Sequence, residues 1–364
     1  MTRLSELRQQ VGQLLIMGFD GTAADARLRP LLFGTQPGGV ILFARNLAGP
    51  RQTFELLRGA QQVVEQPLFT CIDMEGGTVD RLRDLIAPAP AAAHVFASAS
   101  QKLFREHGRL IGAEVRALGF NVDFAPVLDL ALPASRAVMT TRTVSAEPDD
   151  TAAYAREFLR GLRHARVLGC GKHFPGLGEA DLDTHRELPS VRKSLALMRA
   201  QDWAPYRELR RELRFVMVAH AAYPEITGDR TPASLSRKWM QDILRRQIGF
   251  TGLVVSDDLE MGGVLAVGSI EEVAVETLRA GADLFLVCQS EAHVWRAYEA
   301  VLRQAEGDRR FARLVARAAH RVLKFKRQAR ELRPVKAAPT DRQVAGLRAA
   351  LEKFAARVAR EARA

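Results

Sequence analysis

Short apolar runs recur along the chain, separated by longer amphipathic segments. The runs are apolar along their whole length, as expected for strands that are buried on both faces. They lie at residues 14–19, 40–43, 68–73, 122–127, 170–174, 215–220, 253–256 and 284–287. Helical patterns lie between them, for example at 104–118, 151–166, 239–247 and 270–280.

Alternating strands and helices indicate a parallel sheet, and eight such runs predict a closed (β/α)8 barrel. An open, doubly wound sheet is the alternative, but no GxGxxG follows an early strand. After about residue 336 the chain is rich in Ala, Arg and Lys with apolar residues at helical spacing. We therefore expect one α/β barrel domain over 1–335 and a basic C-terminal helical extension over 336–364.

The chain has 53 Lys and Arg against 42 Asp and Glu, which gives a net charge of +11. Many of the arginines lie in helical stretches such as 207–213 and 310–330, where charges usually form solvated faces. Aromatic and basic residues do not interleave as a nucleic-acid platform requires. This composition favours neither a nucleic-acid partner nor a membrane partner.

Three cysteines, Cys71, Cys170 and Cys288, are scattered singly, which fits a reducing compartment. The N-terminus carries early charges, and its longest apolar run, 14–19, is too short for a membrane span or a signal peptide. We therefore expect a cytoplasmic protein.

Ionisable residues gather where the predicted strands end. In a barrel the carboxyl ends of all strands meet on one face, where active sites are found. The residues concerned are Asp73, Glu75, Lys172, His173, His220, Asp257 and Asp258.

The segment VVSDDLEMGG places Asp257 and Asp258 at the end of one apolar run. A strand end holds a nucleophile rigidly, whereas Asp is also a common helix cap. Each residue can take one of these roles, and the pattern alone does not distinguish them.

The segment GKHFPGLGEADLDTHRELP begins as a strand and becomes a loop at Pro175 and Gly176. Asp183 and His185 stand two residues apart in it. A carboxylate beside an imidazole fixes its tautomer and raises its basicity, which suits a proton shuttle near neutral pH. A surface loop is the alternative interpretation of this short pattern.

In CIDMEGGTVDRLRD, Asp73 is followed by Glu75 and a Gly-Gly turn, and then by Arg81 and Arg83. A carboxylate and a guanidinium in one pocket suit sugar hydroxyls, since one accepts and the other donates hydrogen bonds. An ion pair that stabilises the turn is the alternative. No HExxH or paired His and Cys spacing supports a metal site.

At these residues the chain resembles glycoside hydrolase family 3, and within it the single-domain bacterial β-N-acetylglucosaminidases that recycle cell-wall muropeptides. The matching segments are GGVILFARN, IDMEGGTVDRLRD, GFNVDFAPVLDL, KHFPGLGEADLDTH, VMVAHAAYP, PASLS, GFTGLVVSDDLEMGG and AGADLFLVC.

The resemblance implies a retaining exo-β-N-acetylhexosaminidase that removes terminal β-linked N-acetylglucosamine from muropeptides or related oligosaccharides through a covalent glycosyl-enzyme. Asp257 would be the nucleophile, and His185, oriented by Asp183, the acid and then the base. Most glycosidases use a second carboxylate for that proton transfer. The resemblance implies no cofactor or metal. It also implies a set of substrate-binding residues, with the last two at the pocket floor: Asp73, Arg81, Arg142, Lys172, His173, Met217 and His220.

The chain departs from the family pattern at several positions. Leu177 stands where KHFPGHG has a histidine, Thr78 replaces a usual arginine, and VMTTR, with Thr140, replaces IGxR before Arg142. Val144 replaces an aromatic residue. These departures keep open a sugar-binding barrel with weakened catalysis.

A phosphorylase is the other alternative, because a neutral imidazole does not repel an incoming phosphate as a carboxylate would.

Overall fold

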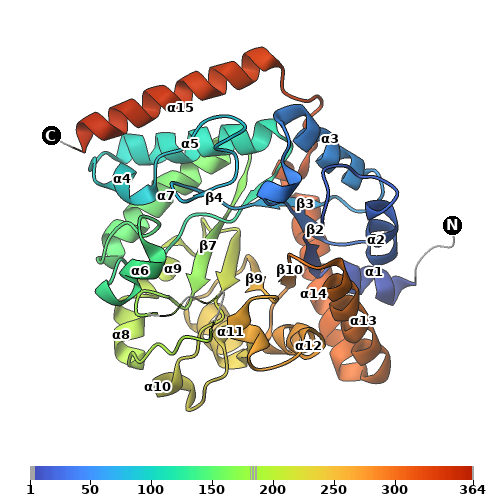
Figure 1. Ribbon diagram of the computed structural model, residues 1–364. Helices are drawn as coiled ribbons and strands as arrows, with labels where there is room; N and C mark the ends of the chain where they lie inside the picture. Colours follow the sequence, from blue (N-terminus) through green and yellow to red (C-terminus); the bar gives the residue numbers. More distant parts are fainter. Residues whose placement is uncertain (1–4, 181, 183, 185–186, 363–364) are drawn as a thin grey trace.

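The computed structural model describes residues 5–180, 182, 184 and 187–362. Eight parallel strands close into a barrel in the order β1-β10-β9-β8-β7-β6-β3-β2 (Figure 1). The predicted closed barrel is confirmed, and the open doubly wound alternative is wrong. The barrel strands are β1 Leu15–Met17, β2 Gly39–Ile41, β3 Phe69–Ile72, β6 Val122–Asp123, β7 Leu168–Phe174, β8 Phe215–Val218, β9 Leu253–Asp258 and β10 Leu284–Val287.

Every predicted apolar run overlaps one of these strands, but the bounds differ, and β2, β7 and β9 extend beyond their runs. The run at 122–127 gives only the two-residue strand β6, because Pro126 has no N–H to donate to a neighbouring strand. An antiparallel hairpin of β4 Met74–Gly76 and β5 Val79–Asp80 follows β3 outside the barrel. The sequence pattern did not predict this hairpin, since strands of two or three residues show no clear period.

Helices surround the barrel, and α5 and α7 pack extensively against each other. The predicted helices at 104–118, 151–166 and 270–280 are confirmed as α5, α7 and α12. The segment 239–247 forms a π-helix, η4 Lys238–Gln247. The α-helices are α1 Glu6–Gly12, α2 Leu28–Thr35, α3 Pro50–Gln61, α4 Ala92–Phe96, α5 Gln101–Ala117, α6 Arg136–Met139, α7 Pro148–His164, α8 Leu195–Ala200, α9 Ala204–Leu209, α10 Pro224–Thr227, α11 Gly262–Leu265, α12 Ile270–Ala280, α13 Glu291–Gly307, α14 Arg309–Gln328 and α15 Asp341–Glu361. Short 3-10 turns occur at η1 Ala44–Asn46, η2 Pro133–Ser135, η3 Ala233–Leu235 and η5 Arg330–Leu332.

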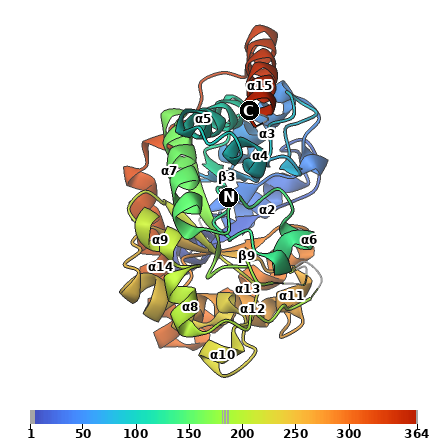
Figure 2. The same cartoon turned by 90° about the vertical axis from the view of Figure 1, so that its left-hand side faces the viewer.

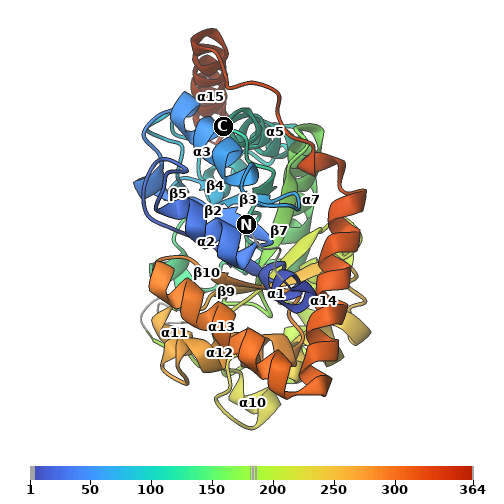
Figure 3. The ribbon, with the colours of Figure 1, turned by 90° about the vertical axis from the view of Figure 1, so that its right-hand side faces the viewer.

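Helices α12, α13 and α14 lie side by side on one flank of the barrel (Figure 3). Helix α12 begins with a capping box, in which Ser269 accepts from the N–H of Glu272 and the Glu272 carboxylate accepts from the N–H of Ser269. This exchange satisfies two N–H groups that the first turn leaves unpaired. The local sequence therefore fixes where this helix starts.

Helix α14 closes the N-terminal end of the barrel. The ring of Phe325 lies 6.0 Å from that of Phe69 and 5.5 Å from that of Phe215, at the starts of β3 and β8. Nζ of the buried Lys326 donates to Gln13 Oε1 and to the carbonyl of Gly38, both at 2.8 Å. Side chains thus fill this end of the barrel.

The C-terminal helix α15 lies outside the barrel alongside α5 (Figures 1 and 2). It buries Leu351, Phe354 and Val358, and the Phe354 ring stacks on His107 at 5.8 Å between centroids. Arg357 pairs with Glu106 at 2.8 Å. The division into a barrel domain of 1–335 and a tail of 336–364 stays a prediction. Among the described residues, none of the helices is both long and apolar enough to cross a membrane.

Candidate active site

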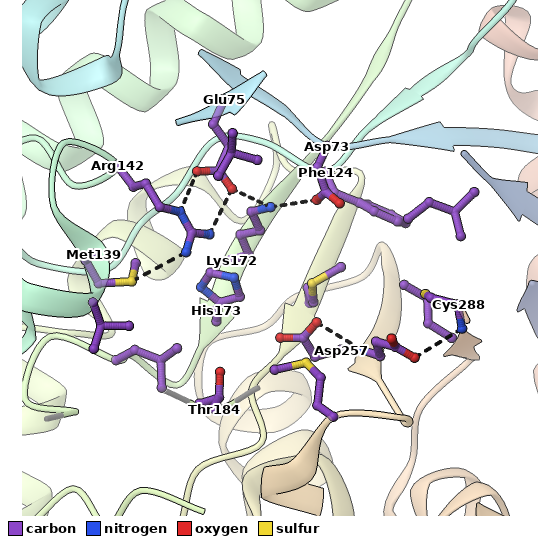
Figure 4. Close-up of a pocket in the computed structure, with 18 of the residues that line it drawn as sticks. Asp73, Glu75, Phe124, Met139, Arg142, Lys172, His173, Thr184, Asp257 and Cys288 are labelled. Atoms are coloured by element: carbon purple, nitrogen blue, oxygen red, sulfur yellow. Dashed lines mark hydrogen bonds and ion pairs between the residues drawn. The ribbon is translucent and has the colours of Figure 1, made fainter. Parts of the chain in front are cut away.

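A pocket of about 240 Å³ opens at the C-terminal ends of the strands (Figure 4). Residues at the ends of β3, β7, β8, β9 and β10 line it, together with side chains from β4 and the loops. The convergence predicted from the strand ends is therefore seen. Six of the seven expected substrate-binding residues and one expected catalytic residue line this pocket: Asp73, Arg81, Arg142, Lys172, His173, Met217 and Asp257.

Lys172 connects two carboxylates on one wall of the pocket. Its Nζ lies 2.8 Å from Asp73 Oδ1 and 2.7 Å from Glu75 Oε1. Lys172 is buried in the interior of β7, where an unpaired ammonium would be strongly destabilised. Burial lowers the pKa of Lys172, but Asp73 and Glu75 outweigh this and raise its pKa above the ordinary value. The lysine therefore stays charged.

Arg142 holds Glu75 from the other side. Its Nε donates to Oε2 of Glu75 at 2.7 Å and its Nη2 to Oε1 at 2.9 Å. Burial raises the pKa of Glu75, but Lys172 and Arg142 outweigh it and hold that pKa well below its usual range. The sequence left open an ion pair within this turn. Glu75 does form ion pairs, but its partners are Arg142 and Lys172 across the pocket and not Arg81 or Arg83.

Arg81 follows the β4–β5 hairpin, and its guanidinium lies 5.7 Å from the ring centre of Phe43. Its Nε is buried and has no hydrogen-bond partner among the described residues. A buried donor without a partner is destabilising, and a ligand that accepts its hydrogen bond would remove that penalty. Arg81 is thus suited to bind a sugar hydroxyl.

His173 is fixed by a buried carboxylate behind it. Its Nδ1 lies 2.7 Å from Asp129 Oδ2, and Asp129 Oδ1 accepts from the N–H of Leu177 at 2.7 Å. One carboxylate thus orients the imidazole and anchors the start of the following loop. Asp129 lies in the segment GFNVDFAPVLDL, but its sequence gave no sign of this role.

The two adjacent aspartates at the end of β9 have different surroundings. Asp257 lines the pocket, and its Oδ1 accepts from the N–H of Asp258 at 2.9 Å. Asp258 Oδ1 accepts from the N–H groups of Glu260 and Cys288, both at 3.1 Å. Burial raises the pKa of Asp258 to about 7. Asp258 therefore connects β9 to the end of β10, and it does not cap α11, whose N-cap is Met261.

His220 lies at the end of β8 and is fully buried. The described side chains that line the pocket include Met217 but do not include His220. Its Nδ1 lies 2.6 Å from Ser234 Oγ, and its Nε2 lies 2.9 Å from the carbonyl oxygen of Asp258. The structure thus places His220 behind the strand end that carries Asp257.

The proposed proton shuttle, Asp183 and His185, lies outside the described residues. Leu182 and Thr184 are described, and both line the pocket. The shuttle stays a prediction from the sequence.

Of the departures from the family pattern, Leu177, which is 5% exposed, and Val138 and Met139 of VMTTR are among the described side chains that line the pocket. Thr78 is exposed at the turn between β4 and β5, and Thr140 ends α6 with φ of 46°. Val144 is half-buried against the main core. The departures therefore reach the pocket at Leu177 and at the VMTTR segment before Arg142.

The lining charges are arranged for hydrogen bonding to a neutral polar ligand. Three cations and four carboxyl groups of the described residues face the pocket, and most of these cations are already paired. Among the described residues, no group of three or more His, Cys, Asp or Glu side chains is placed to hold a metal ion. Paired charges in such a pocket bind hydroxyl and amide groups and support a carboxylate nucleophile.

Comparison with known proteins supports this assignment. Residues 6–325 match the glycosyl hydrolase family 3 N-terminal domain, and the chain belongs to this family. It is a glycoside hydrolase.

Two curated relatives are named Beta-hexosaminidase. That of Idiomarina loihiensis is 36% identical over 296 residues, covering 80% of this chain and 88% of the relative. The relative from Pseudomonas aeruginosa is 38% identical over 290 residues, covering 79% of this chain and 86% of the relative.

Two solved structures share the fold over nearly the whole chain. A family 3 β-N-acetylglucosaminidase from Paenibacillus sp. is 32% identical with a TM-score of 0.89, over 96% of this chain and 68% of that one. Native NagZ from Neisseria gonorrhoeae is 30% identical with a TM-score of 0.77, over 95% of this chain and 97% of that one.

Proposed function

We propose that this protein is a retaining exo-β-N-acetylhexosaminidase. The observation that carries the proposal is that Asp257, at a rigid strand end, shares one pocket with Arg81 and with the Lys172–Asp73 pair. The names of the curated relatives and of the similar structures support the same activity.

In the proposed reaction, Asp257 attacks the anomeric carbon of the terminal sugar and displaces the aglycone oxygen, forming a covalent glycosyl-enzyme. His185, oriented by Asp183, gives a proton to that oxygen and then takes one from the water that releases the sugar. The terminal sugar would be held by Asp73, Arg81, Arg142, Lys172, His173 and Met217.

Hydrolysis is favoured over transfer to phosphate by the charges of the pocket. Lys172 and Arg142 are already neutralised by Asp73 and Glu75, and Asp257 and Asp258 add further carboxyl groups. A phosphate dianion would find Arg81 as the remaining cation among the described lining residues.

The test is turnover of 4-methylumbelliferyl β-N-acetylglucosaminide by the wild type and by Asp257→Ala and His185→Ala, with and without phosphate. We expect hydrolysis that is lost in the first variant and reduced in the second. A sugar 1-phosphate product would favour the phosphorylase. A folded wild type that binds N-acetylglucosamine without turnover would favour the sugar-binding barrel.

We further propose that the natural substrates are muropeptides, on the strength of the motif resemblance, and that the protein works in the cytoplasm. The three cysteines are buried and unpaired, which fits a reducing compartment. Product analysis on a purified muropeptide mixture, with loss of one N-acetylhexosamine as the expected mass change, tests the substrate.

A further inference from the structure

Two matched sequence segments, VMVAHAAYP and PASLS, meet behind the end of β9. His220 comes from the first and Ser234 from the second, and both are fully buried. The Ser234 hydroxyl lies 2.6 Å from Nδ1 of His220, and Nε2 of His220 lies 2.9 Å from the carbonyl oxygen of Asp258. Neither His220 nor Ser234 is among the described residues that line the pocket, so direct contact with substrate does not account for these hydrogen bonds.

The direction of these hydrogen bonds follows from the chemistry of the groups. A carbonyl oxygen only accepts, so Nε2 of His220 carries the proton that is donated to Asp258. In the neutral ring Nδ1 is then an acceptor, and it accepts from the hydroxyl of Ser234. Ser234 therefore holds, through Nδ1, the ring whose Nε2–H binds the carbonyl of Asp258.

Ser234 is itself held in place by its backbone. Its N–H donates to the carbonyl of Ala219 at 3.1 Å, and its carbonyl accepts from Thr277 Oγ1 at 3.0 Å. Thr277 is a fully buried residue of α12. A series of hydrogen bonds thus runs from a surrounding helix to the end of β9.

The backbone of Asp258 connects this series of hydrogen bonds to the side chain of Asp257. Its carbonyl is bound by His220, while its N–H donates to Asp257 Oδ1 at 2.9 Å. We propose that Ser234 and His220 are positioning residues, which set the orientation of the Asp257 carboxylate through the backbone of Asp258. This inference rests on the proposed function, because it assigns Asp257 as the nucleophile.

The test compares Ser234→Ala with Tyr154→Phe. Tyr154 offers a matched control, since its hydroxyl lies 2.8 Å from Nδ1 of the buried His107, and neither residue is among the described residues that line the pocket. We expect Ser234→Ala to lower kcat/KM by about 10- to 100-fold, because small misplacement of a nucleophile slows attack strongly. Inhibition by free N-acetylglucosamine should stay within about two-fold of the wild type. Tyr154→Phe should leave both values unchanged.

Two aryl leaving groups separate the nucleophile from the proton shuttle. A 2,4-dinitrophenyl glycoside needs little protonation of its leaving group, whereas a 4-methylumbelliferyl glycoside needs more. If the nucleophile is misplaced, Ser234→Ala lowers kcat/KM for both substrates. An effect confined to the 4-methylumbelliferyl glycoside would overturn the inference.

The tautomer gives a readout that does not depend on activity. In ¹⁵N NMR of the wild type we expect His220 to be protonated at Nε2 and to accept a hydrogen bond at Nδ1, and in Ser234→Ala we expect the Nδ1 resonance to shift to that of a ring nitrogen that has lost this donor. Ser234→Thr keeps the hydroxyl and should restore both the Nδ1 resonance and the rate. Two results would overturn this inference but leave the proposed function standing. One is a wild-type His220 that is protonated only at Nδ1, and the other is unchanged kinetics in a folded Ser234→Ala. A folded but inactive wild type would overturn the proposed function with it.

Discussion

Glu75 and Arg142 form a two-point ion pair inside the pocket, with the guanidinium Nε 2.7 Å from one carboxylate oxygen and Nη2 2.9 Å from the other. Their side chains are 3% and 16% exposed. Lys172 approaches the same carboxylate at 2.7 Å. The carboxylate of Glu75 therefore balances Arg142 and shares Lys172 with Asp73.

We expect Glu75→Gln to lower the free energy of unfolding by about 3 kcal/mol, because removing one partner of a buried pair leaves the other charge uncompensated. Urea unfolding at neutral pH measures this change. Glu271→Gln is the matched control. Glu271 binds Arg296 with the same two-point geometry, at 2.7 and 2.9 Å, but on the surface, with 52% of the Arg296 side chain exposed. We expect a loss under about 1 kcal/mol there. Equal losses of unfolding free energy in the two variants would mean that burial does not strengthen the ion pair of Glu75.

Asp258 should give the stability of the protein an unusual dependence on pH. Burial raises its pKa to about 7 from 3.8. Between these values the unfolded chain has released the proton while the folded protein keeps it, so stability falls as pH rises. Relative to Asp258→Asn, the wild type should lose up to about 4 kcal/mol between pH 4 and pH 7.

Asp308→Asn provides a control of opposite sign. The N–H groups of Arg310 and Phe311 lower the pKa of Asp308, so its contribution to stability is present above its unfolded pKa and is lost in acid. Unfolding curves at several pH values compare the three proteins. A wild type and Asp258→Asn variant with parallel pH profiles would show that Asp258 is ionised in the folded protein.

Leu177 and Leu182 both line the pocket but differ in burial, at 5% and 39% exposed. We expect Leu177→Ala to lower the free energy of unfolding by about 2–4 kcal/mol, because Leu177 belongs to a buried apolar cluster. Leu182→Ala should lower it by less than about 1 kcal/mol. Thermal and urea unfolding measure both. If the two variants were equally stable, the loop around Leu177 would not be packed as described.

Phe354 tests whether α15 unfolds with the barrel. This ring is 1% exposed against His107 and α5, and α15 buries only two other side chains, Leu351 and Val358. We expect Phe354→Ala to release α15, with fast amide exchange over residues 341–361, while the amides of β7 stay protected. Turnover of the aryl glycoside should be unchanged. Loss of protection in β7 would instead mean that the tail and the barrel form one cooperative unit.

The fold was predictable because its signals are local. Each barrel strand overlaps one apolar run, and α5, α7 and α12 follow from a single helical period. The lining residues were predictable as far as they stand at strand ends, as Asp73, Lys172 and Asp257 do. The pairings were not, since Glu75 meets Arg142 across 67 positions and Asp129 meets the N–H of Leu177 across 48. Such partners are set by how the loops pack, and no spacing in the sequence encodes that.

The ring of Phe325 and the side chain of Lys326 fill the N-terminal end of the barrel, while the pocket opens at the other end. Among the described residues, the route into the site is therefore also the route out. In the proposed reaction the terminal sugar binds deepest, behind the aglycone, and leaves after it. The shape of the barrel would then order the release of products, and a long substrate would have to dissociate before its next sugar could be removed.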